Sequence, residues 1–243
     1  MFNGKIEDYI LFEDEDIVVC RKPAGVAVQN ARIGAMDLES CLKNYLAIKT
    51  GGRSVPYLAV VHRLDQPVEG VLVFGKTPKA AKELSAQISA GKMEKIYLAV
   101  TYGQPKTAEN TEKSSCMILE DYLKKDGKTN TSSVVSANTP GAKVAKLSYE
   151  ILDSAEDKIS GRKKWLLKIH LDTGRHHQIR VQMAHAGLPL AGDRKYGAGN
   201  SAGTGNVSLA LCAASLTFFH PVTGKRMKFE TKPEGIEFAE FQI

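Results

Sequence analysis

The sequence has no long apolar run and no clustered cysteines. Nothing in it approaches the ~18 consecutive apolar residues that a membrane-spanning helix requires. Its first residues, MFNGKIEDYILFEDED, lack the basic stretch and apolar core of a secretory signal. The four cysteines are widely scattered without a CxxC pair, which argues against a disulfide or zinc framework. We therefore expect a cytoplasmic protein with reduced, mostly buried thiols and no membrane partner.

What the sequence does have is an ordinary globular composition with a basic balance. Its 243 residues are 43% hydrophobic and 25% charged, enough for one large domain or two small lobes. The net charge of +6 fits a polyanionic partner, because neutralising phosphates supplies much of the affinity for nucleic acids. Charge alone leaves that partner undecided.

Runs rich in Val, Ile, Leu and aromatics, bounded by Gly, Pro and Asn, predict many strands. They are Ile17–Cys20, Tyr57–Val61, Val71–Phe74, Ile96–Tyr102, Lys143–Leu152, Trp165–Leu171, Ser208–Phe219 and Met227–Glu230. Helices are expected at Leu38–Ile48, from the Thr77 cap and Pro78 to Gly91, and at His177–Ala186. This balance, without βαβ alternation, predicts an α+β fold with a mixed, mostly antiparallel central sheet and flanking helices. Residues 124–140 and 197–206, polar and glycine-rich, are expected to be loops.

A first candidate segment is His62-Arg63-Leu64-Asp65, which ends a strand run just before Gln66-Pro67. A carboxylate at a strand end, beside an arginine, is well placed to face a cleft. An aspartate that only caps a turn would leave the same pattern, so these residues by themselves keep both interpretations open.

Two further segments carry polar side chains in a regular setting. The strand Lys95–Val100 has Tyr97 on one face, where it either stacks on a base or belongs to the core. The stretch Leu171–Val181 passes from a strand through a Thr-Gly turn into a helix. Its first free amides and Arg175 are suited to phosphate, although a basic surface helix without a ligand fits as well.

Taken together, these segments resemble the RluA family of pseudouridine synthases. The family's HRLD motif matches His62–Asp65, its K-x-Y-x-A strand matches Lys95–Ala99, and its T-G-R-x-H-Q-I-R-V segment matches Thr173–Val181. Shorter matches are Lys22-Pro23-Ala24-Gly25, Ala184-His185-x-Gly187, Gly192-Asp193-x-x-Tyr196-Gly197 and His220-Pro221-x-Thr223-Gly224-Lys225. The resemblance spans about residues 15–232.

The resemblance implies a pseudouridine synthase fold with a central RNA-binding cleft, and an enzyme that isomerises uridine in ribosomal or transfer RNA without a cofactor. Asp65 would be the catalytic carboxylate, acting either as a nucleophile or as a base. Tyr97 would stack on the uracil, and Arg180 would pair with Asp65 and keep it ionised. The residues implied to contact RNA are His62, Arg63, Arg175, His176, His177 and Gln178. No protein partner is implied, and a monomer is the default.

The sequence departs from the family pattern in two places. Gln66-Pro67-Val68-Glu69-Gly70 stands where x-x-Thr-Ser-Gly is common, and His176 and Gln182 replace a common Thr and His. Since Asp65, Tyr97 and Arg180 are present, these changes bear on RNA choice more than on chemistry. Few residues precede the first match, so we expect one catalytic domain over 1–243 without a separate N-terminal RNA-binding domain.

Three other interpretations deserve a test. Gly70–Thr77 satisfies the phosphate-loop pattern GxxxxGK[ST], but Val-Leu-Val-Phe within it favours a strand. A metal site at His176, His177 and His185 is not expected, because the spacing is wrong for chelation and the adjacent pair should point apart. The more serious rival is a catalytically inactive RNA-binding protein of the same fold.

Overall fold

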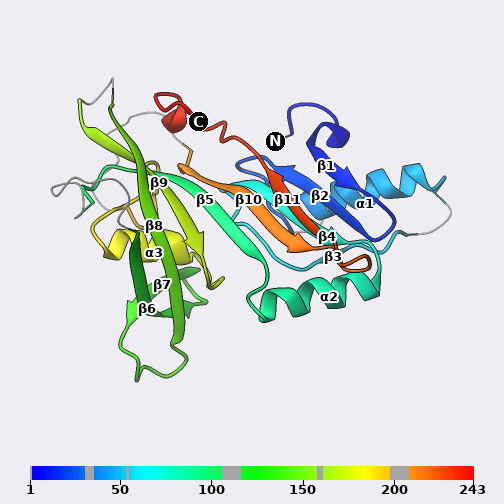
Figure 1. Cartoon of the computed structure of the whole chain (residues 1–243), viewed down its shortest axis with the longest axis horizontal. Coiled ribbons are helices and arrows are strands. Elements are labelled where there is room, and N and C mark those ends of the chain that lie inside the picture. Colours follow the sequence, from blue (N-terminus) through cyan, green and yellow to red (C-terminus); the bar gives the residue numbers. More distant parts are fainter. Residues whose placement is uncertain (1, 31–35, 53–54, 106–115, 158–160, 198–207) are drawn as a thin grey trace. The chain divides into compact units, whose positions relative to one another are not determined.

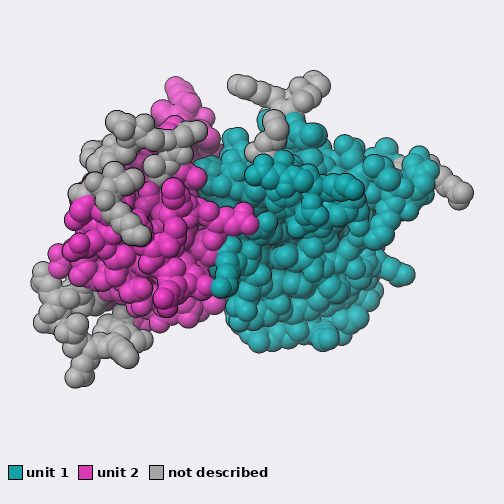
Figure 2. Space-filling model, turned by 90° about the horizontal axis from the view of Figure 1, so that it is seen from above, with its two compact units in different colours: residues 1–94, 213–232 teal, residues 95–212, 233–243 magenta. Residues whose placement is uncertain are grey.

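The computed structural model describes residues 2–30, 36–52, 55–105, 116–157, 161–197 and 208–243. The chain forms two compact units, coloured separately in Figure 2. Unit 1 consists of residues 1–94 and 213–232, and unit 2 of residues 95–212 and 233–243. Each unit combines segments that are distant in sequence.

Unit 1 is a mostly antiparallel sheet with two α-helices among its described residues. Its strands run in the order β1-β2-β4-β10, with β3 beside β4 and β11 beside β10 (Figure 1). The elements are η1 (Ile6–Tyr9), β1 (Ile10–Glu13), β2 (Ile17–Lys22), α1 (Leu38–Lys49), β3 (Ala59–Val60), β4 (Glu69–Gly75), α2 (Pro78–Ser89), β10 (Leu211–Phe219, from Ala213 onward in this unit) and β11 (Arg226–Glu230).

The core of unit 1 forms because β2 and β4 each contain a continuous apolar run, Ile17–Cys20 and Val71–Phe74. Ile17 pairs with Gly75 and Lys22 with Gly70 in one continuous antiparallel register. Val71 and Val73 of β4 pack with Ala80 and Leu84 of α2 in one buried cluster. Full burial of each valine or leucine side chain contributes about 1.5–3 kcal/mol. This packing fixes the start of β4, which directly follows the segment that carries Asp65.

The helix predictions for unit 1 are confirmed by local capping. Asp37 accepts a hydrogen bond from the Ser40 amide at the start of α1, and Thr77 accepts one from the Ala80 amide at the start of α2. Such caps satisfy amides that have no partner within the helix. The expected strand 57–61 is only Ala59–Val60, and β1 was not predicted.

Unit 2 is also built on an antiparallel sheet, with the strand order β5-β9-β8-β6-β7. Its elements are β5 (Glu94–Thr101, from Lys95 onward in this unit), β6 (Met117–Asp126), β7 (Thr131–Val135), β8 (Lys143–Glu156), β9 (Lys163–Leu171), α3 (Gln178–His185) and η3 (Ile236–Phe238). The sheet-dominated α+β prediction is therefore confirmed.

The prediction of a loop over residues 124–140 is wrong, because much of it is the hairpin of β6 and β7. Lys124 pairs with Ser133 and Asp126 with Thr131. The Asp126 carboxylate closes the turn by accepting hydrogen bonds from the Lys128 amide and the Thr129 hydroxyl. The end of β6 (residues 124–126) and the start of β7 (residues 131–133) are polar, so their composition resembles a loop. The expected loop 197–206 falls almost entirely outside the described residues.

The expectation of mostly buried thiols holds only in part. All four cysteines are free, but only Cys20 and Cys212 are buried, and Cys116 is exposed. Across the described ranges, no helix has both the length and the apolar character needed to cross a membrane.

Candidate active site

Asp65 lies in the loop between β3 and β4, where it is half-buried. Its neighbour Leu64 is only 7% exposed and anchors the loop to the core. The Asp65 carbonyl accepts a hydrogen bond of 3.0 Å from the Val68 amide, which closes a tight turn over Gln66 and Pro67. The carboxylate is thus carried by a short segment that is fixed at both ends.

Lys22 fastens this loop from β2. Its side chain has no exposed surface, and its Nζ donates to the carbonyls of Pro23, Val26 and Gln66 at 3.0, 2.7 and 3.0 Å. Burial lowers the pKa of Lys22 to about 7, against the opposing effect of the nearby Asp65 and Glu69 charges. The Lys22 side chain therefore holds the Asp65 loop, and in its protonated form it supplies positive charge near the Asp65 carboxylate.

A second tie joins the same loop to the turn after β2. The Gly25 amide donates to the Gln66 carbonyl at 2.9 Å, and the Gln66 side-chain amide donates back to the Gly25 carbonyl at 3.0 Å. The sequence showed Lys22-Pro23-Ala24-Gly25 only as a match to a family motif. In the structure this segment ties the Asp65 loop to the end of β2.

His62 and Arg63, which precede Asp65 in the first segment, differ in how accessible their side chains are. Nε2 of His62 accepts a hydrogen bond of 3.2 Å from the Val73 amide of β4, so one ring nitrogen is used within unit 1. Arg63 is exposed. Contact with RNA remains a prediction for both, and Arg63 is the more accessible.

Tyr97 lies on β5, opposite Ile169 of β9, and is 8% exposed. The antiparallel pairing of β5 with β9 gives the ring a rigid support. Stacking on a uracil stays a prediction, as does the pairing of Asp65 with Arg180, because Asp65 belongs to unit 1 whereas Tyr97 and Arg180 belong to unit 2.

In unit 2, the segment from Thr173 to Gln182 is stabilised by a buried chain of amide side chains. Oε1 of Gln178 accepts hydrogen bonds from the Thr173 hydroxyl and the Arg175 amide. Its Nε2 donates to Gln182, which in turn donates to the Asp121 carboxylate of β6. Gln178 is 3% exposed and its amide is used inside the protein, so it shapes the loop that presents Arg175.

Arg175 itself is exposed, and its Nε donates to the Val144 carbonyl of β8 at 2.8 Å. This bond holds the guanidinium of an exposed residue against β8. A phosphate contact by Arg175 stays a prediction.

His176 and His177 stack on one another, with ring centroids 3.7 Å apart. The expectation that adjacent histidines point apart is wrong, because His177 adopts a left-handed backbone conformation (φ 53°) just before α3. Nδ1 and Nε2 of His176 hydrogen-bond Ser132 and Asn130 of the β6–β7 hairpin. Burial lowers the pKa of His177 to about 3, and the charges of His176 and Arg180 add to this effect.

Arg180 is 5% exposed and forms a bidentate ion pair with Asp193. Its Nε donates to Oδ2 at 2.8 Å and its Nη2 to Oδ1 at 2.7 Å. Burial raises the pKa of Asp193, but the hydrogen bond and charge of Arg180 outweigh it and hold the pKa below its usual value. Asp193 therefore neutralises Arg180 and occupies one edge of the guanidinium.

The turn that supplies Asp193 is itself rigid. Oδ1 of Asp193 also accepts hydrogen bonds from the Lys195 and Tyr196 amides, and its carbonyl accepts one from the Gly197 amide. A Cβ at Gly192 would lie 2.3 Å from the Ser208 carbonyl oxygen, and one at Gly197 would lie 2.4 Å from the Asp193 carbonyl oxygen. Both glycines of the Gly192–Gly197 match are thus explained by close backbone approach.

The structure therefore gathers Arg175, His176, His177, Gln178 and Arg180 around the start of α3, and places His62, Arg63 and Asp65 together in unit 1. Sequence reasoning did not assign roles to Lys22, Ser132, Asp193 or Tyr196. Three of these stand in matched motifs, so the motifs indicated importance without indicating a function.

The phosphate-loop interpretation is wrong. Residues Glu69–Gly75 form the buried strand β4, and Thr77 caps α2. Nζ of Lys76 pairs with the Glu13 carboxylate at 2.7 Å. Burial raises the pKa of Glu13, but hydrogen bonds from Lys49 and Lys76 lower it overall to about 2.

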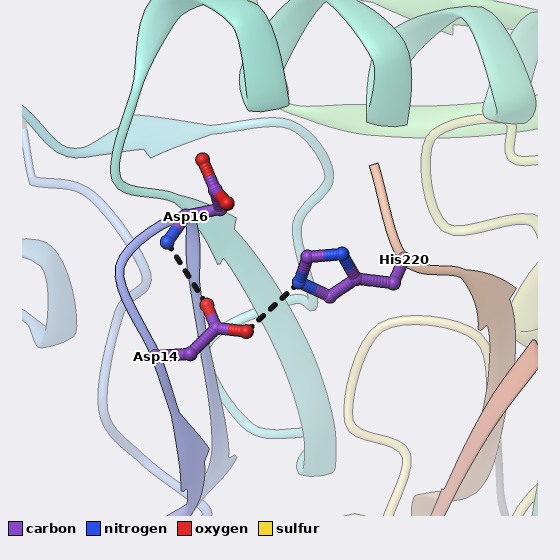
Figure 3. Close-up of side chains that lie close together, drawn as sticks. All are labelled: Asp14, Asp16 and His220. Atoms are coloured by element: carbon purple, nitrogen blue, oxygen red, sulfur yellow. Dashed lines mark hydrogen bonds and ion pairs between the residues drawn. The ribbon is translucent and has the colours of Figure 1, made fainter. Parts of the chain in front are cut away.

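Among the described residues, the side chains that approach one another closely enough to hold a metal ion are Asp14, Asp16 and His220 (Figure 3), not the histidines of the third segment. Nδ1 of His220 accepts from the Val222 and Thr223 amides, and its Nε2 donates to Asp14 at 2.8 Å. The other Asp14 oxygen accepts from the Asp16 and Ile17 amides. These hydrogen bonds explain why the three side chains lie close together: they link the turn between β10 and β11 to the turn that follows β1.

Comparisons with known proteins agree with the family that the three sequence segments resemble. Residues 16–185 match the RNA pseudouridylate synthase family. The chain is 34% identical over 230 residues to ribosomal large subunit pseudouridine synthase C of Yersinia pestis, covering 93% of this chain and 65% of that protein. The same enzyme of Escherichia coli strain K12 is 32% identical over 235 residues, with 93% and 66% covered. The chain thus spans about two thirds of the length of these curated relatives.

Solved structures show the same fold. Human RNA pseudouridylate synthase domain containing 4 superimposes with a TM-score of 0.73 at 22% identity, covering 94% of this chain and 90% of that one. Human RNA pseudouridylate synthase domain containing 1 also gives 0.73, at 19% identity, with 96% and 86% covered. The family predicted from the three segments is therefore confirmed, and the chain belongs to the RNA pseudouridylate synthase family.

Proposed function

We propose that this chain is an RNA pseudouridine synthase that converts uridine to pseudouridine, with Asp65 as its essential carboxylate and no cofactor. The observation that carries the proposal is the family match over residues 16–185, which includes Asp65, Tyr97 and Arg180. The loop that holds Asp65, fastened by Lys22 and Gly25, supports a carboxylate kept in a fixed position.

The reaction breaks the bond between ribose C1′ and uracil N1, turns the base, and joins C1′ to C5. The hydrogen on C5 leaves as a proton and N1 gains one, so no oxidant or reductant takes part. Asp65 contributes either by attacking C1′ or by removing a proton from the sugar. Both routes require it to be ionised, and both end with the carboxylate regenerated.

The remaining residues have complementary roles in this proposal. Arg180 offers Asp65 the guanidinium edge that Asp193 does not occupy. Tyr97 stacks on the uracil, a contact of about 1–3 kcal/mol per base. Leaving the RNA stack costs a few kcal/mol, and Arg63 is the residue we assign to fill the vacated space. Arg175, His176 and His177 contact neighbouring phosphates or bases, His62 contacts RNA from the Asp65 segment, and Gln178 contributes through the Arg175 loop that it holds.

The substrate we propose is structured RNA, with large-subunit ribosomal RNA as the first choice because of the names of the curated relatives. Transfer RNA is the second choice. The net charge of +6 supports either. We further propose that the protein acts in the cytoplasm as a monomer, with one catalytic domain over residues 1–243.

The test is release of tritium from carbon 5 of uracil in large-subunit ribosomal and transfer RNA transcripts. We expect release by the wild type and none by Asp65→Asn, which should still bind RNA. Glu83→Gln is the matched control, since Glu83 is exposed on α2, and it should release label at the wild-type rate.

The other outcomes separate the alternatives. Equal release by Asp65→Asn and wild type would overturn the role of Asp65. RNA binding by folded wild-type protein without release from any transcript would instead favour a binding protein that has lost catalysis.

A further inference from the structure

Tyr196 contacts two of the residues to which the proposed function assigns roles. It lies half-buried in the turn that follows Asp193. Its ring centroid is 5.1 Å from Cζ of Arg180, and its hydroxyl is 2.7 Å from Nδ1 of His177. The ring and the hydroxyl therefore act on different partners.

The hydroxyl belongs to a directed chain of hydrogen bonds. The Ser132 amide of β7 donates to the Tyr196 oxygen at 2.8 Å. Because an amide can only donate, the tyrosine oxygen accepts that bond, which leaves its own hydrogen available to Nδ1 of His177. With the hydrogen so directed, Nδ1 is the acceptor and the ring proton stands on Nε2. The low pKa of His177 agrees with a neutral ring.

The ring has a separate effect on Arg180. Asp193 fixes the guanidinium along one edge, through Nε and Nη2. Tyr196 lies over its face at a cation–π distance. An edge contact and a face contact together leave the guanidinium little freedom to turn, so its second edge keeps a constant direction.

We propose that Tyr196 is a positioning residue with two separable roles: its hydroxyl selects the His177 tautomer that donates through Nε2, and its ring holds the guanidinium of Arg180 for catalysis. This inference rests on the proposed function, because the consequences for turnover follow only if Arg180 and His177 serve that reaction. The tautomer itself is a property of the protein without RNA.

The first test measures the tautomer directly, by long-range proton–nitrogen NMR correlations of the His177 ring in the free protein. We expect the Nε2–H form in wild type and a mixture of both forms in Tyr196→Phe. Ser132→Ala is the matched control: it removes the hydroxyl contact with His176 but keeps the amide that donates to Tyr196, so the tautomer should not change. An Nδ1–H ring in wild type, or no change in Tyr196→Phe, would overturn the role of the hydroxyl.

The second test separates binding from turnover in the tritium assay. Tyr196→Phe keeps the ring, so kcat should stay within about twofold while KM rises about five- to tenfold through His177. Tyr196→Leu removes the ring as well, and kcat should fall at least about tenfold. A fall in kcat of equal size in both variants would show that the ring has no separate role.

The two proposals fail in distinguishable ways. In one outcome, wild type shows an Nε2–H ring that depends on Tyr196 and yet releases no tritium. That result would overturn the proposed function, and with it the predicted effects of Tyr196 on kcat and KM. If wild type releases tritium but the His177 tautomer is the same in Tyr196→Phe as in wild type, the role of the Tyr196 hydroxyl is overturned and the proposed function is unaffected.

Discussion

Nζ of Lys22 lies 3.0 Å from the carbonyl oxygen of Gln66, the residue directly after Asp65. Three carbonyl oxygens share this one buried ammonium. The Gln66 contact ties the Asp65 loop to β2, and the Pro23 and Val26 contacts hold the segment that follows β2.

Lys22→Met should lower the free energy of unfolding by about 3 kcal/mol, because it leaves three carbonyls without their charged donor. Urea denaturation measures this loss. Lys79→Met, at an exposed position of α2, should change stability by less than about 0.5 kcal/mol. Equal stability of the two variants would show that Lys22 does not fasten the loop.

Removing either partner of the Arg180–Asp193 ion pair should destabilise unit 2 by about 3–5 kcal/mol, because the other charge remains buried. The double variant Arg180→Met/Asp193→Leu should lose much less than the sum of the two single variants. A double-mutant cycle in denaturant unfolding measures the coupling. Strictly additive losses would contradict a direct pair.

His177 should make stability fall as the pH falls. Its pKa is about 3 in the folded protein and about 6.5 in an unfolded chain. Between these values the unfolded chain binds a proton that the folded protein does not, so folding becomes less favourable from about pH 6.5 down to about pH 3.

Urea unfolding at about pH 7 and about pH 5 tests this expectation. His177→Asn, which tolerates the left-handed backbone, should lose less stability between the two conditions than wild type. His170→Gln is the control at an exposed position, and it should follow wild type. Parallel losses in all three proteins would mean that His177 is not held neutral.

Arg175→Gln should weaken RNA binding without lowering the stability of the fold. Loss of one phosphate contact reduces the slope of log affinity against log salt by about one. Binding titrations between low and moderate salt measure this slope. Lys79→Gln serves as the control of equal charge change, and an unchanged slope in Arg175→Gln would remove Arg175 from the phosphate contacts.

Much of the fold follows from local patterns in the sequence. Helix α2 begins where Thr77 and Pro78 predict it, because capping and a preset proline φ depend only on neighbours. The β6–β7 hairpin escaped prediction because its sequence from Lys124 to Ser133 is polar apart from Gly127, which is typical of a loop, whereas the alternating burial of β6 shows only in the fold.

The candidate site was predictable as a set of segments but not as a set of contacts. Arg180 was identified from its motif, whereas its partner Asp193 lies in a different turn whose direction depends on close packing at Gly192 and Gly197. Similarly, no pattern in the sequence shows that Lys22 is buried. These interactions depend on tertiary packing, which spacing along the chain does not encode.

The β6–β7 hairpin reaches His176 through Asn130 and Ser132, whereas Arg180 is held by Asp193 and Tyr196 within its own stretch of chain. Changes of the Asn130 and Ser132 side chains can therefore alter the contacts of His176 without removing the contacts that Asp193 and Tyr196 make with Arg180. We expect substitutions at these two positions to change RNA choice more than the rate of isomerisation.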